Sequence, residues 1–208
     1  MEDVLEVYAR PRDPNRPLVC LDEFSKQLLS EVAASLPAKP GHPAREDYEY
    51  VREGTASAFM LASPLEGTRE VFIGPEGRRT ARDYALALRY LADELYPDAE
   101  KIILVQDNLN THCAASLYQT FPAQQARALA ERFEFHYTPK HGSWLNIAEI
   151  EISALIRCCL DRRIGSRVTF TEQIEAYLKK KNRTPSPVCW QMTCDDARIK
   201  LASLYPPV

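Results

Sequence analysis

The sequence of 208 residues lacks the signatures of several large protein classes. It has no GxSxG motif, no P-loop and no GxGxxG motif, so serine hydrolases with that elbow and the common nucleotide-binding folds are poorly supported. Its longest apolar runs, at residues 58–62 and 102–105, are far shorter than the roughly 20 residues of a membrane span. The N-terminus is acidic and has no signal-peptide core, so we expect a cytoplasmic protein without a membrane partner.

Disulfide pairs and zinc motifs are also missing. Six cysteines are scattered along the chain without a CxxC pair or a cysteine and histidine spacing that suits zinc, so we expect buried, reduced thiols. The formal net charge is −3, whereas a domain devoted to gripping nucleic acid is expected to be basic. Residues 157–183 nevertheless hold an excess of lysine and arginine, which either meets phosphates or forms a solvated helix surface.

The order of the apolar patterns predicts an α/β domain. After an extended lead-in over residues 1–17, residues 18–21 are predicted to form a buried strand that ends at Asp22. The remaining predictions are strands at 54–63 and 68–74 joined as a hairpin, a helix from Thr80 to Pro97, a strand at 101–107, helices within 113–133 broken at Pro122, a strand at 133–138, a helix over 143–160 and a helix from a capping box at Thr169 to Lys181. This order indicates a mixed sheet covered by helices.

Two of the predicted buried strands end in an aspartate, at Asp22 and Asp107. Sites in open α/β sheets collect at the carboxyl ends of strands, and neighbouring strands lie about 4.8 Å apart. If these strands are neighbours, the carboxylates converge, and a hard divalent cation such as Mg²⁺ or Mn²⁺ would relieve their repulsion. Taken singly, each aspartate is better explained as a turn or cap residue, and only the repetition of the pattern brings a metal site into consideration on equal terms.

The helix expected over 143–160 supplies a third carboxylate. At about 100° per residue, Glu149 lies within about 40° of Leu145 and about 20° of Ile156, both on the apolar stripe, whereas Glu151 falls at the edge of the stripe or in solvent. An inward glutamate is costly unless it is paired or coordinates a metal, so Glu149 is the predicted third ligand. The alternative is an amphipathic side chain that reaches water from the border of the stripe.

Four segments give the chain a specific resemblance to a known family. They are LVCLDEFSKQL around Asp22, ILVQDNLNTH around Asp107, HYTPKHGSWLNIAEIE around Glu149 and the C-terminal WQMTCDDARIKLASLYP. In this order they resemble the catalytic domain of DDE-type transposases from bacterial insertion sequences, in the mariner-like branch called insertion-sequence family 630. The resemblance implies a ribonuclease H-like (integrase-type) fold, a mixed five-stranded sheet flanked by helices, in which Asp22, Asp107 and Glu149 form the catalytic and metal-binding triad.

The resemblance also bears on the organisation of the chain. It implies a catalytic core over residues 18–165 and a C-terminal helical extension of the same domain over 166–208. Members of the family carry an N-terminal pair of helix-turn-helix modules that bind the transposon ends, and we expect none here, because nothing before Pro17 fits one. Residues 108–148 separate Asp107 from Glu149, a longer spacing than in the eukaryotic mariner pattern but one that the insertion-sequence branch resembles.

By resemblance, the expected function is transposition of DNA. It implies a pair of Mg²⁺ ions, with Mn²⁺ as a substitute, cleavage of DNA at transposon ends, strand transfer into target DNA at TA, a homodimer in the synaptic complex, and a place near the nucleoid. A ribonuclease H-like nuclease or resolvase and a transposase-derived domain without activity are the alternative functions. The residues expected to contact DNA are Asn108, His112, Lys140, His141, Trp144 and Asn146.

For several of these residues the sequence leaves a structural role open. Asn108 and His112 either touch DNA or orient Asp107, and Trp144 either stacks on a base or packs in the core. Glu23 is expected to be a solvated acid, with tuning of the metal site as the alternative.

Overall fold

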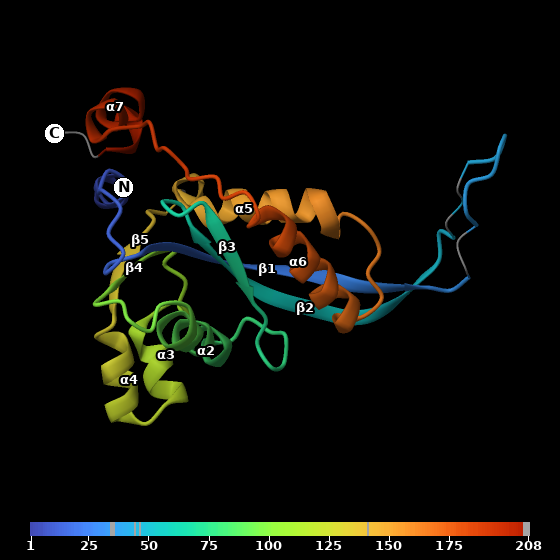
Figure 1. Cartoon of the computed structure of the whole chain (residues 1–208), viewed down its shortest axis with the longest axis horizontal. Helices are drawn as coiled ribbons and strands as arrows, with labels where there is room; N and C mark the ends of the chain where they lie inside the picture. Colours follow the sequence, from blue (N-terminus) through green and yellow to red (C-terminus); the bar gives the residue numbers. More distant parts are fainter. Residues whose placement is uncertain (34–35, 44, 46, 141, 206–208) are drawn as a thin grey trace.

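The structure, a computed structural model, describes all residues except 34, 35, 44, 46, 141 and 206–208 (Figure 1). Its centre is a five-stranded sheet in the order β3-β2-β1-β4-β5. The strands β1, β2 and β3 pair in antiparallel fashion, whereas β4 is parallel to both β1 and β5, so the mixed α/β sheet is confirmed. The strands are β1 Leu18–Glu31, β2 Tyr50–Ser63, β3 Thr68–Phe72, β4 Ile102–Gln106 and β5 Phe133–Tyr137.

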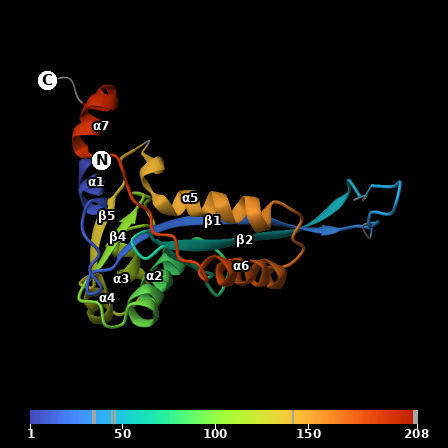
Figure 2. The same cartoon turned by 45° about the horizontal axis from the view of Figure 1, so that its top comes forward.

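Helices cover both faces of the sheet (Figures 1 and 2). Alternate residues of β1 point to opposite faces, so Leu18 and Cys20 enter one core cluster and Val19 and Leu21 enter the other. The first cluster includes residues of α1 (Glu2–Tyr8), α5 (Ile147–Leu155), α6 (Arg167–Lys181) and α7 (Cys194–Lys200), and the second includes residues of α2 (Ala81–Tyr90), α3 (Ala114–Thr120) and α4 (Ala123–Ala130). Short turns complete the set: π-helical Leu91–Leu95 (η1) and Ile156–Leu160 (η3), and 3₁₀ Ser143–Leu145 (η2) and Ala202–Leu204 (η4).

Most of the predicted elements are confirmed within a few residues. The hairpin between β2 and β3 turns over residues 64–67, and helix α2 begins after Thr80, whose side chain accepts a hydrogen bond from the Asp83 backbone N–H at 3.3 Å. The break at Pro122 separates α3 from α4. Helix α5 and its flanking turns fill the predicted range 143–160. These elements have local signals, namely capping residues, prolines and apolar periodicity.

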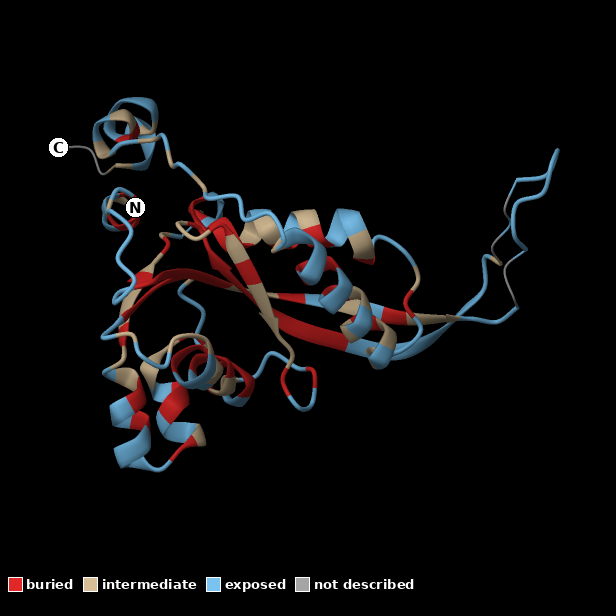
Figure 3. Cartoon of the chain, viewed as in Figure 1, coloured by how far each residue is buried: buried red, intermediate tan, exposed pale blue. Residues whose placement is uncertain are grey.

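The prediction that β1 ends at Asp22 is wrong, because the strand continues to Glu31. Its parallel pairing with β4 stops at Cys20 and Val105, but its antiparallel pairing with β2 continues, aligning Asp22 with Met60. Beyond Asp22, β1 and β2 run between α5 and α6, and the connection between the two strands projects past these helices (Figure 2). Leu28 of β1 is buried there, whereas the first residues of β2 are exposed (Figure 3). The polar residues that follow Leu21 are therefore part of the strand, although in the sequence they look like its end.

The extended lead-in predicted over residues 1–17 is also wrong, since Glu2–Tyr8 forms helix α1. All the prolines of this segment follow the helix, beginning with Pro11, so they do not prevent it from forming. The helix buries an apolar face, and the Tyr8 hydroxyl donates a hydrogen bond to the Leu145 carbonyl at 2.6 Å. Helix α1 is thereby attached to the turn that precedes α5.

Helix α6 starts earlier than predicted. Its cap is Ser166, whose hydroxyl accepts from the Thr169 backbone N–H at 3.1 Å, rather than Thr169 itself. Phe170 is fully buried, and its ring lies 6.1 Å from that of Phe24 on β1. The first part of the predicted C-terminal extension thus packs directly on the sheet, while α7 packs against α1 through an ion pair between Arg198 and Glu2.

The six cysteines are free, but the expectation that they are buried holds fully for Cys20 alone. Cys158 and Cys189 are exposed, and the other three are half-buried. Exposed thiols have no sequence signature that separates them from buried ones, because burial depends on packing between elements. In the part of the chain that the structure describes, no helix is both long and apolar enough to cross a bilayer.

Candidate metal and active site

Asp22 and Asp107 lie beside each other where β4 ends. The parallel register between β1 and β4 aligns Cys20 with Val105. Two residues further along the same register, Asp22 on β1 faces the position of Asp107, which directly follows β4. Paired strands are about 4.8 Å apart, so the condition for the predicted convergence, that the two strands are neighbours, is met.

Asp22 is half-buried on the face of the sheet that α5 covers. Its Oδ1 accepts a hydrogen bond from the Glu23 backbone N–H at 2.9 Å, and its Oδ2 accepts one from the Asn146 amide at 3.3 Å. Burial, followed by the negative charges of Glu23 and Asp107, raises the pKa of Asp22 to about 7. A carboxyl group with this pKa lies among acidic neighbours with too little positive charge, which is the environment that a cation would relieve.

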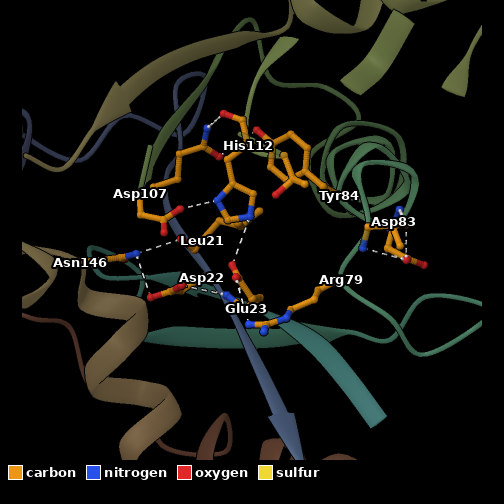
Figure 4. A network of polar contacts seen from close by, with 12 residues as sticks. Leu21, Asp22, Glu23, Arg79, Asp83, Tyr84, Asp107, His112 and Asn146 are labelled. Atoms are coloured by element: carbon orange, nitrogen blue, oxygen red, sulfur yellow. Dashed lines mark hydrogen bonds and ion pairs between the residues drawn. The ribbon is translucent and has the colours of Figure 1, made fainter. Parts of the chain in front are cut away.

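Asp107 is held from the other side by a buried histidine (Figure 4). The His112 side chain is 1% exposed, its Nδ1 contacts Oδ1 of Asp107, and its Nε2 lies 3.2 Å from Oε2 of Glu23. Burial lowers the pKa of His112, but the hydrogen bond and charge of Asp107 and the neighbouring Glu23 outweigh burial and raise this pKa to about 9. The imidazole is therefore a cation at neutral pH, clamped between two carboxylates.

These contacts bear on two predictions. His112 was expected either to touch DNA or to orient Asp107, and its buried position against Asp107 fits the second alternative. Glu23 was expected to be a solvated acid, but its side chain is 9% exposed and lies on the opposite face of β1 from Asp22, next to His112. The burial of Glu23 was not visible in a local pattern, because the two residues meet through a contact between β1 and the loop after β4.

Two residues that sequence reasoning missed fix the position of the histidine. The ring of Tyr84 on α2 stacks on that of His112, with centroids 4.8 Å apart and planes at 25°. The Tyr84 hydroxyl donates to Oε1 of Gln106 at 2.8 Å, and the Gln106 amide donates to the His112 carbonyl at 3.0 Å. A buried glutamine at the end of an otherwise apolar strand is the one sequence signal that points to such a network.

Asn146 caps helix α5 rather than facing a DNA strand. Its Oδ1 accepts from the Ala148 backbone N–H at 3.2 Å, and its amide reaches the Leu21 carbonyl at 2.9 Å as well as Asp22. The side chain is 1% exposed and its polar atoms are engaged inside the protein, so this structure gives Asn146 a structural role and no accessible atom for DNA. The residue instead ties the start of α5 to Asp22.

Glu149 lies in the first turn of α5 and is half-buried, as the apolar stripe predicted. It follows the cap residue Asn146 by three residues, so Glu149 lies at the end of α5 whose cap contacts Asp22. In the described chain it makes no hydrogen bond to either aspartate. Glu151 lies at the edge of the stripe, where it pairs with the buried Arg69 at 3.0 Å.

An open groove of about 490 Å³ lies next to Asp107. The predicted DNA contacts Asn108 and Lys140 are both exposed and both line it. Trp144 is 36% exposed and stacks on Trp190 at 6.3 Å, so it combines packing with an accessible edge; His141 lies outside the described residues. The groove is lined by Asp107, Asn108, Leu109, Thr138, Pro139, Lys140 and Ser143.

The donor atoms fit a hard divalent cation. Carboxylate oxygens are the preferred ligands of Mg²⁺ and Mn²⁺, and burial together with the negative charges of Glu23 and Asp107 raises the pKa of Asp22. A second group of donors, on Glu23, Asp107 and His112, lies within 4.8 Å of one another. In that group the imidazolium already supplies the positive charge, so the side of Asp107 that faces Asp22 is the better place for a cation.

Comparison with known proteins agrees with this arrangement. Residues 17–171 match the family model described as DDE superfamily endonuclease. Among solved structures, the Mos1 mariner paired end complex with Mn is similar with a TM-score of 0.53 and 18% identity, over 85% of this chain and 52% of that chain. The Mos1 strand transfer complex gives 0.53 and 17%, over 85% and 50%. No curated protein sequence matches.

The chain thus spans about half the length of those solved chains. At these identities the similarity shows a shared fold, which is the ribonuclease H-like mixed sheet flanked by helices.

Proposed function

Because this chain belongs to the DDE superfamily endonucleases, we propose that it is the catalytic domain of a transposase of the insertion-sequence family 630 type. In this proposal it cleaves DNA at transposon ends and joins the freed ends to target DNA, as a homodimer that holds both ends. The similar Mos1 structures are a paired end complex and a strand transfer complex, which supports these two steps. The observation that carries the proposal is the juxtaposition of Asp22 and Asp107, with a pKa of Asp22 raised to about 7.

We assign the catalytic, metal-binding triad to Asp22, Asp107 and Glu149, with two Mg²⁺ or Mn²⁺ ions as cofactors. A divalent cation held by such oxygens stabilises the charge that develops in phosphoryl transfer and lowers the pKa of a nucleophilic water. Asp22 lies on the central strand and is oriented by Asn146, so its oxygens are fixed before any ligand arrives. Glu149 would complete the set from the first turn of α5.

The substrate of the first step is a phosphodiester bond, and hydrolysis leaves a 3′-hydroxyl and a 5′-phosphate. That hydroxyl is the nucleophile of the second step, in which a new phosphodiester forms and the 3′ oxygen of the target strand leaves. The groove beside Asp107 suits a DNA strand, because Lys140 can meet a phosphate and Asn108 can donate a hydrogen bond to one. Trp144 is partly exposed and is an aromatic residue of the kind on which a terminal base can stack.

The direct test is a nicking assay on supercoiled DNA that carries a transposon end, with Mg²⁺, with Mn²⁺ and with a chelator. We expect nicking with either ion and none with the chelator. A well-folded chain that binds DNA but nicks it in none of the three conditions would identify a transposase-derived domain without activity. Nicking of RNA–DNA hybrids or of four-way junctions in preference to transposon ends would favour a cellular ribonuclease H-like enzyme.

Lys140 gives a prediction about DNA binding. Lys140→Ala is expected to weaken binding of DNA of any sequence and to reduce the slope of log Kd against log salt by about 1, as expected for the loss of one phosphate contact. The matched control is Lys101→Ala, an exposed lysine at the opposite end of β4. Fluorescence anisotropy at several salt concentrations measures both variants. Equal slopes for the two variants would remove Lys140 from the DNA path.

A further inference from the structure

His112, the histidine next to Asp107, has contacts at both ring nitrogens, at one face of its ring and at its backbone carbonyl (Figure 4). One ring nitrogen contacts Asp107, and the other lies 3.2 Å from Glu23. The face of the ring stacks on Tyr84, and Gln106 holds the backbone carbonyl. A ring with both nitrogens and one face engaged has no freedom to rotate toward a ligand.

The Asp107 carboxylate is held by fewer contacts of its own strand than the Asp22 carboxylate. Asp22 lies within a long strand and accepts two hydrogen bonds, whereas Asp107 follows the last residue of β4 and its side chain is 32% exposed. Among the described residues, His112 is the one side chain that contacts the Asp107 carboxylate, and it uses Oδ1. The other oxygen, Oδ2, is left without a hydrogen bond in this part of the chain.

We propose that His112, held in place by Glu23, is a positioning residue that fixes the Asp107 carboxylate so that Oδ2 is presented to a divalent cation shared with Asp22. This inference rests on the proposed function, because it names what orients the second aspartate of that site. Partners that orient a metal ligand are typically worth about 10–100-fold in metal affinity or activity.

Glu23 supports the histidine rather than the cation. It neighbours Asp22 in sequence but points to the other face of β1, toward α2 and the loop after β4. Its second oxygen, Oε1, lies 3.5 Å from the exposed guanidinium of Arg79. Glu23 is thus placed between two cationic groups, and its charge is balanced without a metal.

The alternative is that Glu23, Asp107 and His112 themselves bind the metal, since their donor atoms lie within 4.8 Å of one another. For His112 to become a ligand, one ring nitrogen would have to leave its carboxylate partner and bind the cation directly. The two possibilities therefore differ in whether an imidazole nitrogen coordinates the metal.

A matched pair of variants tests the positioning role. In His112→Asn the short amide places a donor near the position of Nδ1, toward Asp107; in His112→Gln the longer amide places it near the position of Nε2, toward Glu23. Both variants lose the positive charge, so their comparison isolates the contact to Asp107. We expect Mn²⁺ affinity, measured by calorimetry, to fall about 10–100-fold in His112→Gln and to stay within about threefold in His112→Asn. Equal affinities in the two variants would overturn the proposal.

A measurement on the unmodified chain covers the case in which a variant fails to fold. Mn²⁺ is bound to the unmodified chain, and pulsed electron paramagnetic resonance is used to detect the coupling of a directly coordinated nitrogen to the metal. We expect no such coupling, because His112 contacts the carboxylate and not the cation. A coupling from a coordinated imidazole nitrogen would make histidine a ligand and overturn the proposal.

Failure of the proposed function gives a different result. If Asp22→Asn leaves Mn²⁺ binding unchanged, the metal site assigned to Asp22 and Asp107 is wrong. If Asp22→Asn abolishes binding while His112→Gln has no effect, the metal site stands and the positioning role of His112 is wrong.

Discussion

Asp22→Asn is expected to abolish metal-dependent DNA nicking and, at the same time, to stabilise the folded protein above pH 7. Loss of nicking follows because a neutral amide replaces the carboxylate shared by the site, and the charge stabilisation that a bound cation supplies is worth several kcal/mol, or about 10³-fold or more in rate. Single-turnover nicking assays at saturating Mg²⁺ measure this loss. Nicking within about tenfold of the unmodified chain would remove Asp22 from the catalytic set.

The gain in stability follows from the pKa of Asp22, which burial and the charges of Glu23 and Asp107 raise to about 7. In the unfolded chain the pKa of an aspartate is about 3.9, so the carboxyl destabilises the folded state increasingly as the pH rises from that value to about 7. Asparagine carries no such penalty. Partial exposure and the altered contact with Asn146 reduce the gain, and we expect the Tm without metal to rise by about 2–4 °C at pH 8, which corresponds to about 1 kcal/mol.

The difference in Tm between Asp22→Asn and the unmodified chain is also measured at pH 5, to test whether the gain in stability depends on pH as expected. At that pH most of the folded molecules carry a protonated Asp22, so the advantage of asparagine is expected to shrink. The control is Asp98→Asn, an exposed aspartate before β4, which should change neither the Tm nor nicking. A drop in Tm of Asp22→Asn at pH 8 would contradict the repulsion between the carboxylates.

The second large effect concerns the fold. Phe170→Ala is expected to lower the free energy of unfolding by about 3–5 kcal/mol, because the ring is fully buried against Phe24 and its removal leaves a cavity between α6 and β1. In a chain of this size the loss corresponds to a drop in Tm of roughly 6–20 °C. Thermal unfolding followed by circular dichroism measures it.

Val168, on the same helix, is 67% exposed and provides the control. Val168→Ala is expected to change stability by less than about 0.5 kcal/mol. If the two variants were equally mild, the packing of α6 would contribute little to the stability of the domain. If Phe170→Ala is severe, the helix is part of the core that positions β1 and therefore Asp22.

The central part of the site was predictable from sequence because it has a local pattern. Each of the two aspartates comes after a short apolar run, and Glu149 interrupts an apolar helix stripe, so local patterns made these residues candidates, and the family resemblance grouped them as a triad. The ending of β1 at Asp22 was mispredicted for the same reason. Pairing with β2 carries the strand onward through polar residues, and a strand partner is not visible in the pattern of one segment.

The surroundings of the site could not be predicted, because they depend on contacts between distant elements. His112 and Asn146 are polar residues in loops, and such residues usually face solvent or a ligand. Their burial arises from where the loop after β4 and the start of α5 fold back onto β1. The burial of Glu23 was missed in the same way, because the local sequence does not show that His112 lies on the same side of the sheet.

Alternate side chains of β1 point to opposite faces of the sheet, and this fixes the position of the site as well as of the cores. Asp22 and Glu23 belong to different sides of the sheet, as do their β2 partners Met60 and Phe59. Sliding β1 by a single position would send the glutamate toward α5 and the aspartate toward the histidine, and it would invert the apolar residues of both cores as well. The arrangement of the proposed catalytic site is therefore fixed by the same pattern of apolar residues that folds the domain, and a one-residue deletion within Leu18–Leu21 would disrupt both the site and the cores.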